Sequence, residues 1–323
     1  MTGDSTTTRP ARSIRILTGP TASGKSAVAL HICRALNAEL LSIDSMKLYR
    51  RLNIGTAKPD VKIRAEIKHH LIDIKEPWES CTVKEFQAKA EAVIDNTIQA
   101  GVPLIGEGGT PLYLKVLCEG LFNGPGCDVE IRKRLEAEGG AIGIPAMHAR
   151  LAAIDPKAAA KILTGDLRRI VRALEVFELT GYPISHFQSQ WGVPRPDMDV
   201  RLVCLRITRE TLYHRIDSRV QNMLDAGWVD ECRELLSLEN PLSRESLQAL
   251  GYRTLFSHLR EGMPLDDARR QICFDTHNFA RKQINWLKRL PKTRFVDIDG
   301  DESVETVAAR VMNEWNNWDS TNA

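Results

Sequence analysis

The stretch Gly19-Pro-Thr-Ala-Ser-Gly-Lys25-Ser26 decides the fold, because it matches the phosphate-loop pattern Gly-x-x-x-x-Gly-Lys-Ser at every fixed position. A short apolar run, residues 13–18, precedes it, and residues 26–36 follow with helical spacing of apolar side chains. In this setting backbone N–H groups and the helix N-terminus bind an anion, Lys25 adds a positive charge, and the Ser26 hydroxyl can meet a phosphate-bound Mg²⁺. The stretch predicts a phosphate or diphosphate site, but does not by itself predict a nucleotide.

Further apolar runs continue an alternation of strands and helices. Buried strands are expected at residues 39–44, 102–106, 200–207 and 293–298. The first ends on Asp44, and the second leads into the turn Gly108-Gly-Thr110. Such alternation predicts a parallel sheet with ligands outside the carboxyl ends of its strands. The expected fold class is therefore α/β, a P-loop core with a parallel sheet plus a helical insertion.

The helical insertion is indicated by the loss of the strand signal after about residue 118. Helical spacing is found there at residues 129–137, 144–154, 156–163 and 166–179. We expect a helical insertion subdomain at residues 118–199, within a core of residues 13–117 and 200–323. Gly139 and Gly140 are expected to break the first of these helices. Core helices are expected at residues 209–226, 229–237, 265–290 and 303–315.

The composition argues against several classes of protein. The 323 residues include 44 Lys and Arg against 42 Asp and Glu, so a nucleic-acid-binding surface would have to be local. The seven cysteines are scattered without a Cys-x-x-Cys pair, which argues against a disulfide framework and a zinc site. No apolar run approaches the roughly 18 residues of a membrane span. We expect a globular, monomeric protein of the cytosol.

Two polar features have structural as well as functional interpretations. Asp44, at the end of a buried strand, could be a general base, a structural cap or a Mg²⁺ ligand. The pair His69-His70 invites a metal site, but no Cys or carboxylate at ligand spacing completes it, so a packing or helix-ending role is favoured. The residues around Asp44 are needed to decide its role.

Several segments in one order, within roughly residues 13 to 290, closely resemble the tRNA dimethylallyltransferases, which add an isopentenyl group to N6 of an adenine beside the anticodon. They are Ile43-Asp-Ser-Met-Lys-Leu-Tyr49, Asn53-Ile-Gly-Thr-Ala-Lys-Pro59, His69-His-Leu-Ile-Asp73, Gly108-Gly-Thr-Pro-Leu-Tyr113, Arg168-Arg-Ile-Val-Arg-Ala-Leu-Glu-Val176, Ala249-Leu-Gly-Tyr-Arg253 and Arg281-Lys-Gln-Ile-Asn-Trp-Leu287. The resemblance implies transfer of dimethylallyl from dimethylallyl diphosphate to adenine 37 of tRNAs that read codons beginning with U. No zinc-finger extension is found, which favours a bacterial-type enzyme.

The resemblance also implies roles for the residues of the site. Asp44 is expected to be the general base for the weakly nucleophilic N6 amine, and the Thr110 hydroxyl to lie near the reacting adenine. Lys25 is expected to stabilise the departing diphosphate. Diphosphate contacts are expected from Gly19, Thr21, Ala22, Ser23, Gly24, Lys25, Ser26 and Arg219. Mg²⁺ is the expected cofactor, with Ser26 as a ligand.

The tRNA anticodon stem-loop is the expected partner. Contacts with it are expected from Asp44, Ser45, Met46, Lys47, Thr110, Arg132, Arg168, Arg169, Arg172, Gly251, Tyr252, Arg253, Arg281, Lys282, Gln283 and Trp286. For Arg168, Arg169 and Arg172 the alternative is an ion pair with Asp166 or Glu175. For Trp286 the alternative is a position in the core. In the family Lys47 is most often Gln, which both donates and accepts, so base reading by this segment is expected to differ.

Three other functions stay open at this level. The loop could hold ATP in a small-molecule or nucleotide kinase, with Asp44 activating a hydroxyl. A related enzyme could prenylate free AMP or ATP, although the basic C-terminal helices would then have no substrate to hold. A non-catalytic RNA-binding protein could keep the loop for structure alone.

Overall fold

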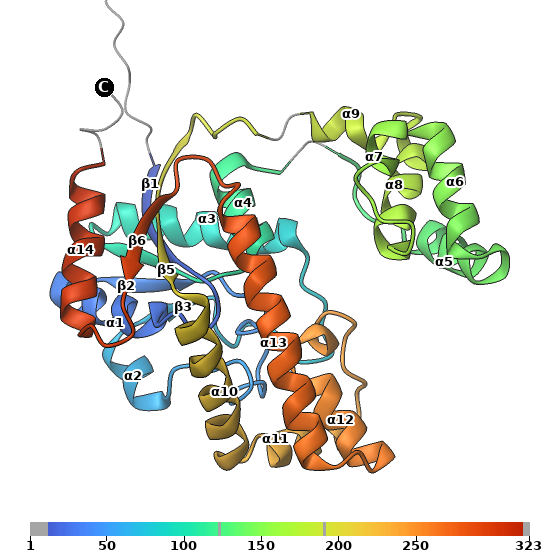
Figure 1. Ribbon diagram of the computed structural model, residues 1–323. Coiled ribbons are helices and arrows are strands. Elements are labelled where there is room, and N and C mark those ends of the chain that lie inside the picture. Colours follow the sequence, from blue (N-terminus) through green and yellow to red (C-terminus); the bar gives the residue numbers. More distant parts are fainter. Residues whose placement is uncertain (1–11, 122–123, 190–191, 319–323) are drawn as a thin grey trace, which may run out of the picture. The chain divides into compact units, whose positions relative to one another are not determined.

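The structure is a computed structural model that describes residues 12–121, 124–189 and 192–318 (Figure 1). The chain divides into two compact units. The first comprises Met1–Cys118 and Arg195–Ala323, and the second comprises Glu119–Pro194. Within the described residues, none of the helices is both long and apolar enough to cross a lipid bilayer.

The first unit is built on a six-stranded, wholly parallel sheet with the strand order β3-β2-β4-β1-β5-β6. The strands are β1 (Arg12–Thr18), β2 (Glu39–Ser42), β3 (His69–His70), β4 (Leu104–Glu107), β5 (Met198–Ile207) and β6 (Arg294–Ile298). β1 and β5 form the longest pairing in the sheet, from Arg12 opposite Met198 to Thr18 opposite Cys204. Their mostly buried, apolar sequences suit strands that are covered on both faces. The predicted α/β fold class is confirmed.

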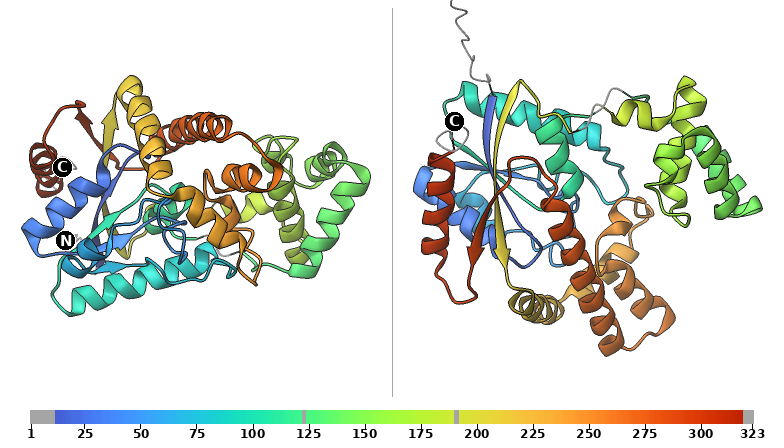
Figure 2. Two further views of the ribbon diagram at one scale, coloured as in Figure 1. Left: turned by 90° about the horizontal axis from the view of Figure 1, so that it is seen from below. Right: turned by 45° about the horizontal axis from the view of Figure 1, so that its top comes forward.

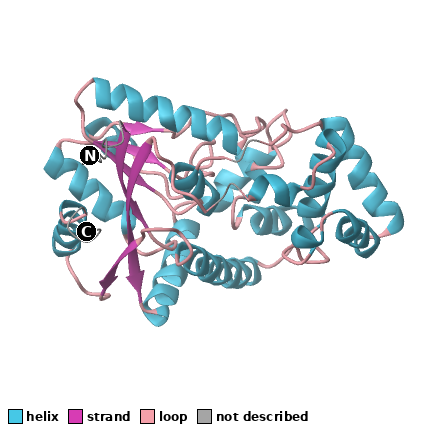
Figure 3. Ribbon diagram, turned by 90° about the horizontal axis from the view of Figure 1, so that it is seen from above, coloured by secondary structure: helices cyan, strands magenta, loops and turns pink. Residues whose placement is uncertain are grey.

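Helices cover both faces of this sheet (Figure 3). The helices of the first unit are α1 (Lys25–Leu36), α2 (Val61–Glu66), α3 (Val83–Gln99), α4 (Pro111–Glu119), α10 (Arg209–Asp225), α11 (Trp228–Leu236), α12 (Tyr252–Glu261), α13 (Leu265–Leu287) and α14 (Val304–Asn316), with a 3₁₀ turn at Ser246–Gln248. α1 and α14 pack together, as do α10 and α13 (Figures 1 and 2). Because parallel crossovers are right-handed, reversing the direction of strand succession after β3 moves the next helix to the opposite face.

Two elements beside the site were not expected from the sequence. α3 begins after Thr82, whose hydroxyl accepts a hydrogen bond from the Glu85 backbone N–H. Thr82-Val-Lys-Glu85 has the spacing of a capping box, a signal that could have located this helix. The strand β3 is only two residues long, His69–His70, and pairs with β2. His70 is hydrogen-bonded to Glu39 of β2, so the histidine pair belongs to the edge of the sheet.

The second unit is helical and has its own apolar core. Its helices are α5 (Val129–Ile142), α6 (Ile144–Ile154), α7 (Pro156–Ala159), α8 (Leu167–Thr180) and α9 (Ile184–Gln188). The prediction that Gly139 and Gly140 break the first helix is wrong, because α5 runs through both residues. A Cβ on Gly139 would lie 2.7 Å from Leu167 Cδ1, so the missing side chain lets the chain segments approach closely.

Candidate active site

The phosphate loop follows β1 and leads into α1, as the sequence predicted. Gly24 caps α1 in the left-handed conformation, with φ 88°. The Ser23 backbone N–H donates to the Pro20 carbonyl at 3.2 Å, which closes the turn. A Cβ on Gly19 would lie 2.8 Å from Ser23 Oγ and 3.2 Å from the Leu205 carbonyl oxygen, so only glycine fits there. The loop and the first turn of α1 thus have the build of an anion site.

Three loops meet at the carboxyl edge of the sheet. Because β4 lies between β2 and β1, the turn Gly108-Gly-Thr110 lies between Asp44 and the phosphate loop. The Gly108 N–H donates to the Leu17 carbonyl, and the Thr110 N–H donates to the Ile43 carbonyl, each at 3.3 Å. A Cβ on Gly108 would lie 2.1 Å from the Ile43 carbonyl oxygen, so a larger residue would separate these loops. The strand order therefore brings Asp44, Thr110 and the phosphate loop together.

Asp44 is held in a tight turn. Its Oδ1 accepts hydrogen bonds from the backbone N–H groups of Met46 at 2.8 Å and Lys47 at 3.2 Å. Within the part of the chain that the structure describes, no hydrogen bond to Oδ2 is found. Thr110 Oγ1 accepts from the Ser45 N–H at 3.0 Å, which fixes the turn to the loop after β4. Asp44 thus has one oxygen that positions it and a second that can accept a proton.

Arg219, from α10, reaches the phosphate loop. Its Nη1 donates to Thr21 Oγ1 at 3.2 Å. Burial lowers the pKa of the guanidinium, while the negative charges of Asp44 and Glu107 act to raise it. The prediction that this arginine serves the anion site is consistent with its position, because its charge lies at the loop that would hold the diphosphate.

Lys25 lies inside the loop, with Nζ donating to the Pro20 carbonyl at 3.3 Å. Burial lowers its pKa; Glu107 acts to raise it, and the nearby charge of Lys47 acts to lower it. Five ionisable residues therefore share one region, three cations and two carboxylates: Lys25, Lys47, Arg219, Asp44 and Glu107. One positive charge is in excess, which favours a polyanionic ligand.

Glu107, the last residue of β4, is a site residue that the sequence did not reveal. It is only 2% exposed. Oε1 accepts a hydrogen bond from Ser26 Oγ at 3.0 Å, and Oε2 accepts one from Lys47 Nζ at 3.4 Å. The apolar strand residues before it gave no sign that a carboxylate would face the phosphate loop. A signal was present, however, in a charged residue directly before Gly108-Gly109-Thr110.

Lys47 was predicted to contact tRNA, and its side chain takes a different direction. The residue is 7% exposed, and its ammonium group lies against Glu107. In this conformation the side chain is turned toward Glu107 at the end of β4.

Gln283 was also predicted to contact tRNA, and the structure places its side chain at the phosphate loop. The side chain is 3% exposed. Its Oε1 accepts from the Thr21 N–H at 2.8 Å, and its Nε2 donates to the Gly109 carbonyl at 2.8 Å. Because both ends of the amide are used, Gln283 ties α13 to the phosphate loop and to the loop after β4.

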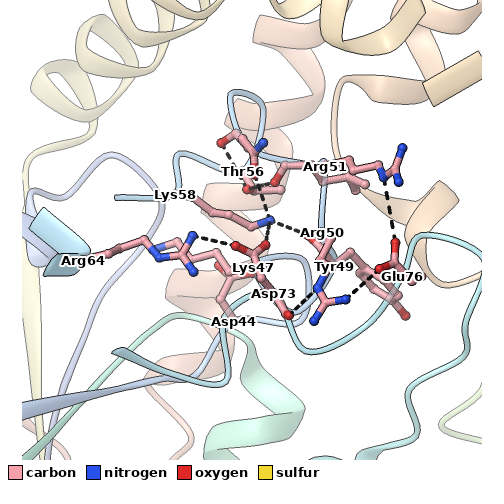
Figure 4. Close-up of polar contacts among 12 residues, drawn as sticks. Asp44, Lys47, Tyr49, Arg50, Arg51, Thr56, Lys58, Arg64, Asp73 and Glu76 are labelled. Atoms are coloured by element: carbon pink, nitrogen blue, oxygen red, sulfur yellow. Dashed lines mark hydrogen bonds and ion pairs between the residues drawn. The ribbon is translucent and has the colours of Figure 1, made fainter. Parts of the chain in front are cut away.

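The segment that follows Asp44 is held by a network of charged residues (Figure 4). Lys58 Nζ and Arg64 Nη1 each bind one oxygen of Asp73 at 2.6 Å. Lys58 also donates to the Tyr49 carbonyl. Burial acts to raise the pKa of Asp73, but the two cations lower it below its usual value. The network fixes the chain on which Asp44 and Lys47 lie.

Gly251 and Tyr252, for which tRNA contacts were predicted, are buried in the structure. The Tyr252 hydroxyl donates to Glu231 at 2.6 Å. The other oxygen of Glu231 accepts from the backbone N–H groups of Asn53 at 2.9 Å and Ile54 at 2.8 Å. A Cβ on Gly251 would lie 2.2 Å from the Trp228 ring. The motif is explained by packing around the turn at residue 54.

The other predicted RNA contacts of the first unit lie on α12 and α13. Arg253, Arg281 and Lys282 are exposed, and Arg281 donates to Asn278 at 2.7 Å. Trp286 is half-buried and packs against the core, which agrees with the structural alternative for this residue. The three exposed cations form the basic surface of these helices.

In the second unit, two of the predicted arginines bind one buried carboxylate. Glu175 on α8 is 0% exposed. It accepts from Arg132 at 2.9 and 3.0 Å, from Arg172 at 2.6 Å, and from the Asp128 N–H at 2.8 Å. Arg168 and Arg169 are exposed on the same helix, and Arg169 pairs with Asp166. Ion pairing, the alternative weighed for Arg168, Arg169 and Arg172, is thus present for Arg169 and Arg172, and Arg132 also pairs with Glu175.

Comparison with known proteins places these features in context. The chain matches the family model of the IPP transferases over residues 47–290, which lies within the segment that carries the sequence motifs. It is 39% identical over 312 residues to the tRNA dimethylallyltransferase of Syntrophobacter fumaroxidans, covering 97% of this chain and 90% of that protein. With the tRNA dimethylallyltransferase of Geobacter metallireducens it shares 41% identity over 296 residues, covering 90% of this chain and 95% of that protein.

Solved structures give the same picture of the fold. The full-length tRNA isopentenylpyrophosphate transferase of Bacillus halodurans matches with a TM-score of 0.67 at 31% identity, covering 96% of this chain and 99% of that chain. A eukaryotic dimethylallyltransferase acting on tRNA matches with a TM-score of 0.80 at 23% identity, covering 96% of this chain and 80% of that chain. At this lower identity the second match speaks for the fold alone.

Proposed function

Because the chain belongs to the IPP transferase family, we propose that it transfers the dimethylallyl group of dimethylallyl diphosphate to N6 of adenine 37 in tRNA. The products are N6-isopentenyladenosine and diphosphate. The observation that carries the proposal is the meeting of Asp44, Thr110 and the phosphate loop at one edge of the sheet. It supplies a base and an anion site for the two halves of the reaction.

The geometry supports a displacement at the allylic carbon. The N6 lone pair forms the new C–N bond, Asp44 accepts the N6 proton, and the C–O bond breaks with its electron pair leaving on the diphosphate. General-base assistance of this kind contributes about 10²- to 10⁴-fold. The growing negative charge on the diphosphate is stabilised by the loop N–H groups, Lys25 and Arg219, which are in place before the reaction.

Mg²⁺ belongs to the proposal as the cofactor. The Ser26 hydroxyl lies in the first turn of α1, at the phosphate loop, and a hard oxygen donor of this kind fits the ion. A bound Mg²⁺ would neutralise charge on the departing diphosphate.

The tRNA side of the proposal rests on exposed cations in each unit. They are Arg253, Arg281 and Lys282 in the first unit and Arg168 and Arg169 in the second. Phosphate contacts from such residues make RNA affinity depend on salt. We expect Arg281→Ala to weaken tRNA binding. The slope of the logarithm of the affinity against the logarithm of the salt concentration should become smaller by about 1.

The decisive experiment is mass spectrometry of tRNA nucleosides after incubation with dimethylallyl diphosphate, beside a parallel incubation with ATP. We expect N6-isopentenyladenosine in the first sample. Saturable ATP hydrolysis without prenyl transfer would instead identify a kinase-like enzyme. Product formed on free AMP but absent from tRNA would identify the nucleotide prenyltransferase.

The base role of Asp44 is tested with a matched pair of variants. Asp44→Ala removes the carboxylate, whereas Asp44→Asn removes the base but keeps an oxygen that can accept from Met46 and Lys47. Both should lower kcat by about 10²- to 10⁴-fold while tRNA binding survives. Near-normal turnover in Asp44→Asn would show that the turn, and not the base, is needed.

A further inference from the structure

Glu107 takes no part in the displacement at the allylic carbon. It ends β4, is 2% exposed, and faces the first turn of α1 with one oxygen and Lys47 with the other. Removing a carboxylate from water costs several kcal/mol unless charges and hydrogen bonds offset it. A buried glutamate at a strand end is thus retained at a cost that apolar residues at this position would avoid.

The neighbours of Glu107 keep it ionised. Lys47 Nζ lies 3.4 Å from Oε2, and the Ser26 hydroxyl donates to Oε1 at 3.0 Å. These are the contacts of a carboxylate, so a negative charge faces the phosphate loop. A negative charge at a site for diphosphate would weaken anion binding, unless a cation comes between them.

The contact with Ser26 indicates where such a cation would lie. In phosphate-loop proteins the hydroxyl after the lysine and a carboxylate at a neighbouring strand end together serve a phosphate-bound Mg²⁺. Ser26 Oγ and Glu107 Oε1 are 3.0 Å apart and come from α1 and β4. Asp44, the carboxylate considered for this role from the sequence, is instead engaged with its own turn.

Resting on the proposed function, we propose that Glu107 is the protein carboxylate of the divalent-metal site, acting with the Ser26 hydroxyl on the cation that accompanies the diphosphate. Lys47 binds the second oxygen and holds the carboxylate in place. Among the five charged residues of the region one positive charge is in excess, and a diphosphate ester bound with one divalent cation brings about one negative charge, so the complete site is close to neutral.

The alternative is that Glu107 serves only as a counter-ion for Lys47 and Lys25. The two roles differ in what happens when both partners of the ion pair are removed together. If Glu107 is only a counter-ion, replacing Lys47 as well should restore the site. If Glu107 acts on the metal, the loss should remain. Glutamine is uncharged, so Lys47→Gln removes the positive charge of the pair and leaves a polar side chain.

The experiment measures Mn²⁺ binding to the full-length protein in the presence of inorganic diphosphate, by the electron paramagnetic resonance signal of free Mn²⁺. We expect Glu107→Gln to weaken Mn²⁺ affinity by about 10- to 100-fold. Lys89→Ala, a change on the surface of α3, should leave the affinity within about twofold, and the double variant Glu107→Gln/Lys47→Gln should be as weak as Glu107→Gln.

Three results would overturn the inference. They are unchanged Mn²⁺ affinity in Glu107→Gln, recovery of affinity in the double variant, and failure of the unmutated protein to bind Mn²⁺ with diphosphate. Circular dichroism of each variant checks folding, and the double variant, which leaves neither buried charge unpaired, stays interpretable if Glu107→Gln is unstable. The Mn²⁺ assay contains neither tRNA nor a prenyl group, so its result does not depend on prenyl transfer. If Glu107→Gln weakens Mn²⁺ binding but the unmutated protein does not prenylate tRNA, the proposed function is refuted and this inference stands.

Discussion

Glu107 and Glu175 are both buried glutamates held by basic side chains, yet they lie in very different surroundings. Glu175 receives two arginines and a backbone N–H inside a helical unit. Glu107 receives one lysine and one hydroxyl at the edge of a parallel sheet, facing a phosphate loop. Charged residues of the same kind thus complete a structural ion-pair cluster in one unit and a chemical site in the other.

The two sites differ in whether their charges and hydrogen bonds are balanced within the protein. The helical unit has filled the oxygens of Glu175, so nothing further is needed there. At the sheet edge Lys25, Lys47 and Arg219 leave one positive charge in excess of the two carboxylates, Asp44 and Glu107. An excess of charge that the protein does not satisfy internally indicates a ligand, whereas a satisfied cluster indicates stability.

The largest effect that this comparison predicts is on turnover. Lys25→Ala should lower kcat by about 10²- to 10³-fold, because it removes a preorganised charge beside the departing diphosphate. Steady-state kinetics with dimethylallyl diphosphate and tRNA would measure it. Lys89→Ala, a change on the surface of α3, serves as the control and should leave kcat unchanged. If Lys25→Ala changed only the stability of the protein, the residues around Glu107 would have a structural role, as those around Glu175 do.

The second prediction concerns stability. Glu175→Gln should weaken the helical unit by about 3 kcal/mol, because Arg132 and Arg172 lose a buried carboxylate. Hydrogen exchange of the amides of α8, followed by mass spectrometry, would report the local change. Glu130→Gln, which removes an exposed partner of Lys133, should have little effect.

The sign of the pH dependence follows for the same cluster. Burial acts to raise the pKa of Glu175, but Arg132 and Arg172 lower it below the usual 4.5. Its contribution to stability is therefore present above pH 4.5 and is lost as the pH falls through the lowered value. The difference in the free energy of unfolding between Glu175→Gln and the unmutated protein should become smaller in acid. A difference that became larger there would contradict the ion-pair explanation.

The third prediction uses the alkaline side of the pH range. Because burial lowers the pKa of Lys25 from 10.5, kcat/KM for dimethylallyl diphosphate should fall with rising pH earlier than an ordinary lysine would allow. The slope approaches about tenfold per pH unit for loss of one proton. Lys25→Arg keeps its charge at high pH and should move the decline upward. An unmutated enzyme with a flat profile up to pH 10.5 would contradict this.

The smallest effect distinguishes two neighbouring glycines of α5. Gly140 has open space where a Cβ would be placed, so Gly140→Ala should stabilise the helical unit by about 0.5–1 kcal/mol. Gly139→Ala should give no such gain, because its Cβ would lie 2.7 Å from Leu167 Cδ1. Urea unfolding of both variants measures the contrast. An equal gain in both would show that the contact with Leu167 does not restrict the helix.

Much of the fold and part of the site could be predicted from the sequence. The phosphate loop carries its own conformational demands, since Gly19 and Gly24 are required locally and the flanking apolar runs show strand and helix periods. Short or irregular elements were harder to predict. β3 is too short to show a period, and α3 was overlooked although a capping box marks its start.

The predicted RNA contacts show the same limit. A sequence motif shows which residues occur side by side in the chain. It does not show the direction in which each side chain points. Tyr252 and Gln283 lie within family-like segments, yet their polar atoms bind Glu231, Thr21 and Gly109. Burial of that kind depends on partners far away along the chain, so no local pattern could reveal it.

By itself the sequence determined the anion site, because a phosphate loop is a local structure whose glycines, lysine and helix start are adjacent in the chain. It also determined the parallel sheet through its alternating periods. Only the tertiary structure decided which carboxylate faces Ser26, since that depends on β4 lying beside β1 in the sheet. The contact joins residues 81 positions apart. Strand order, a property of the whole sheet, made Glu107 and not Asp44 the neighbour of that hydroxyl.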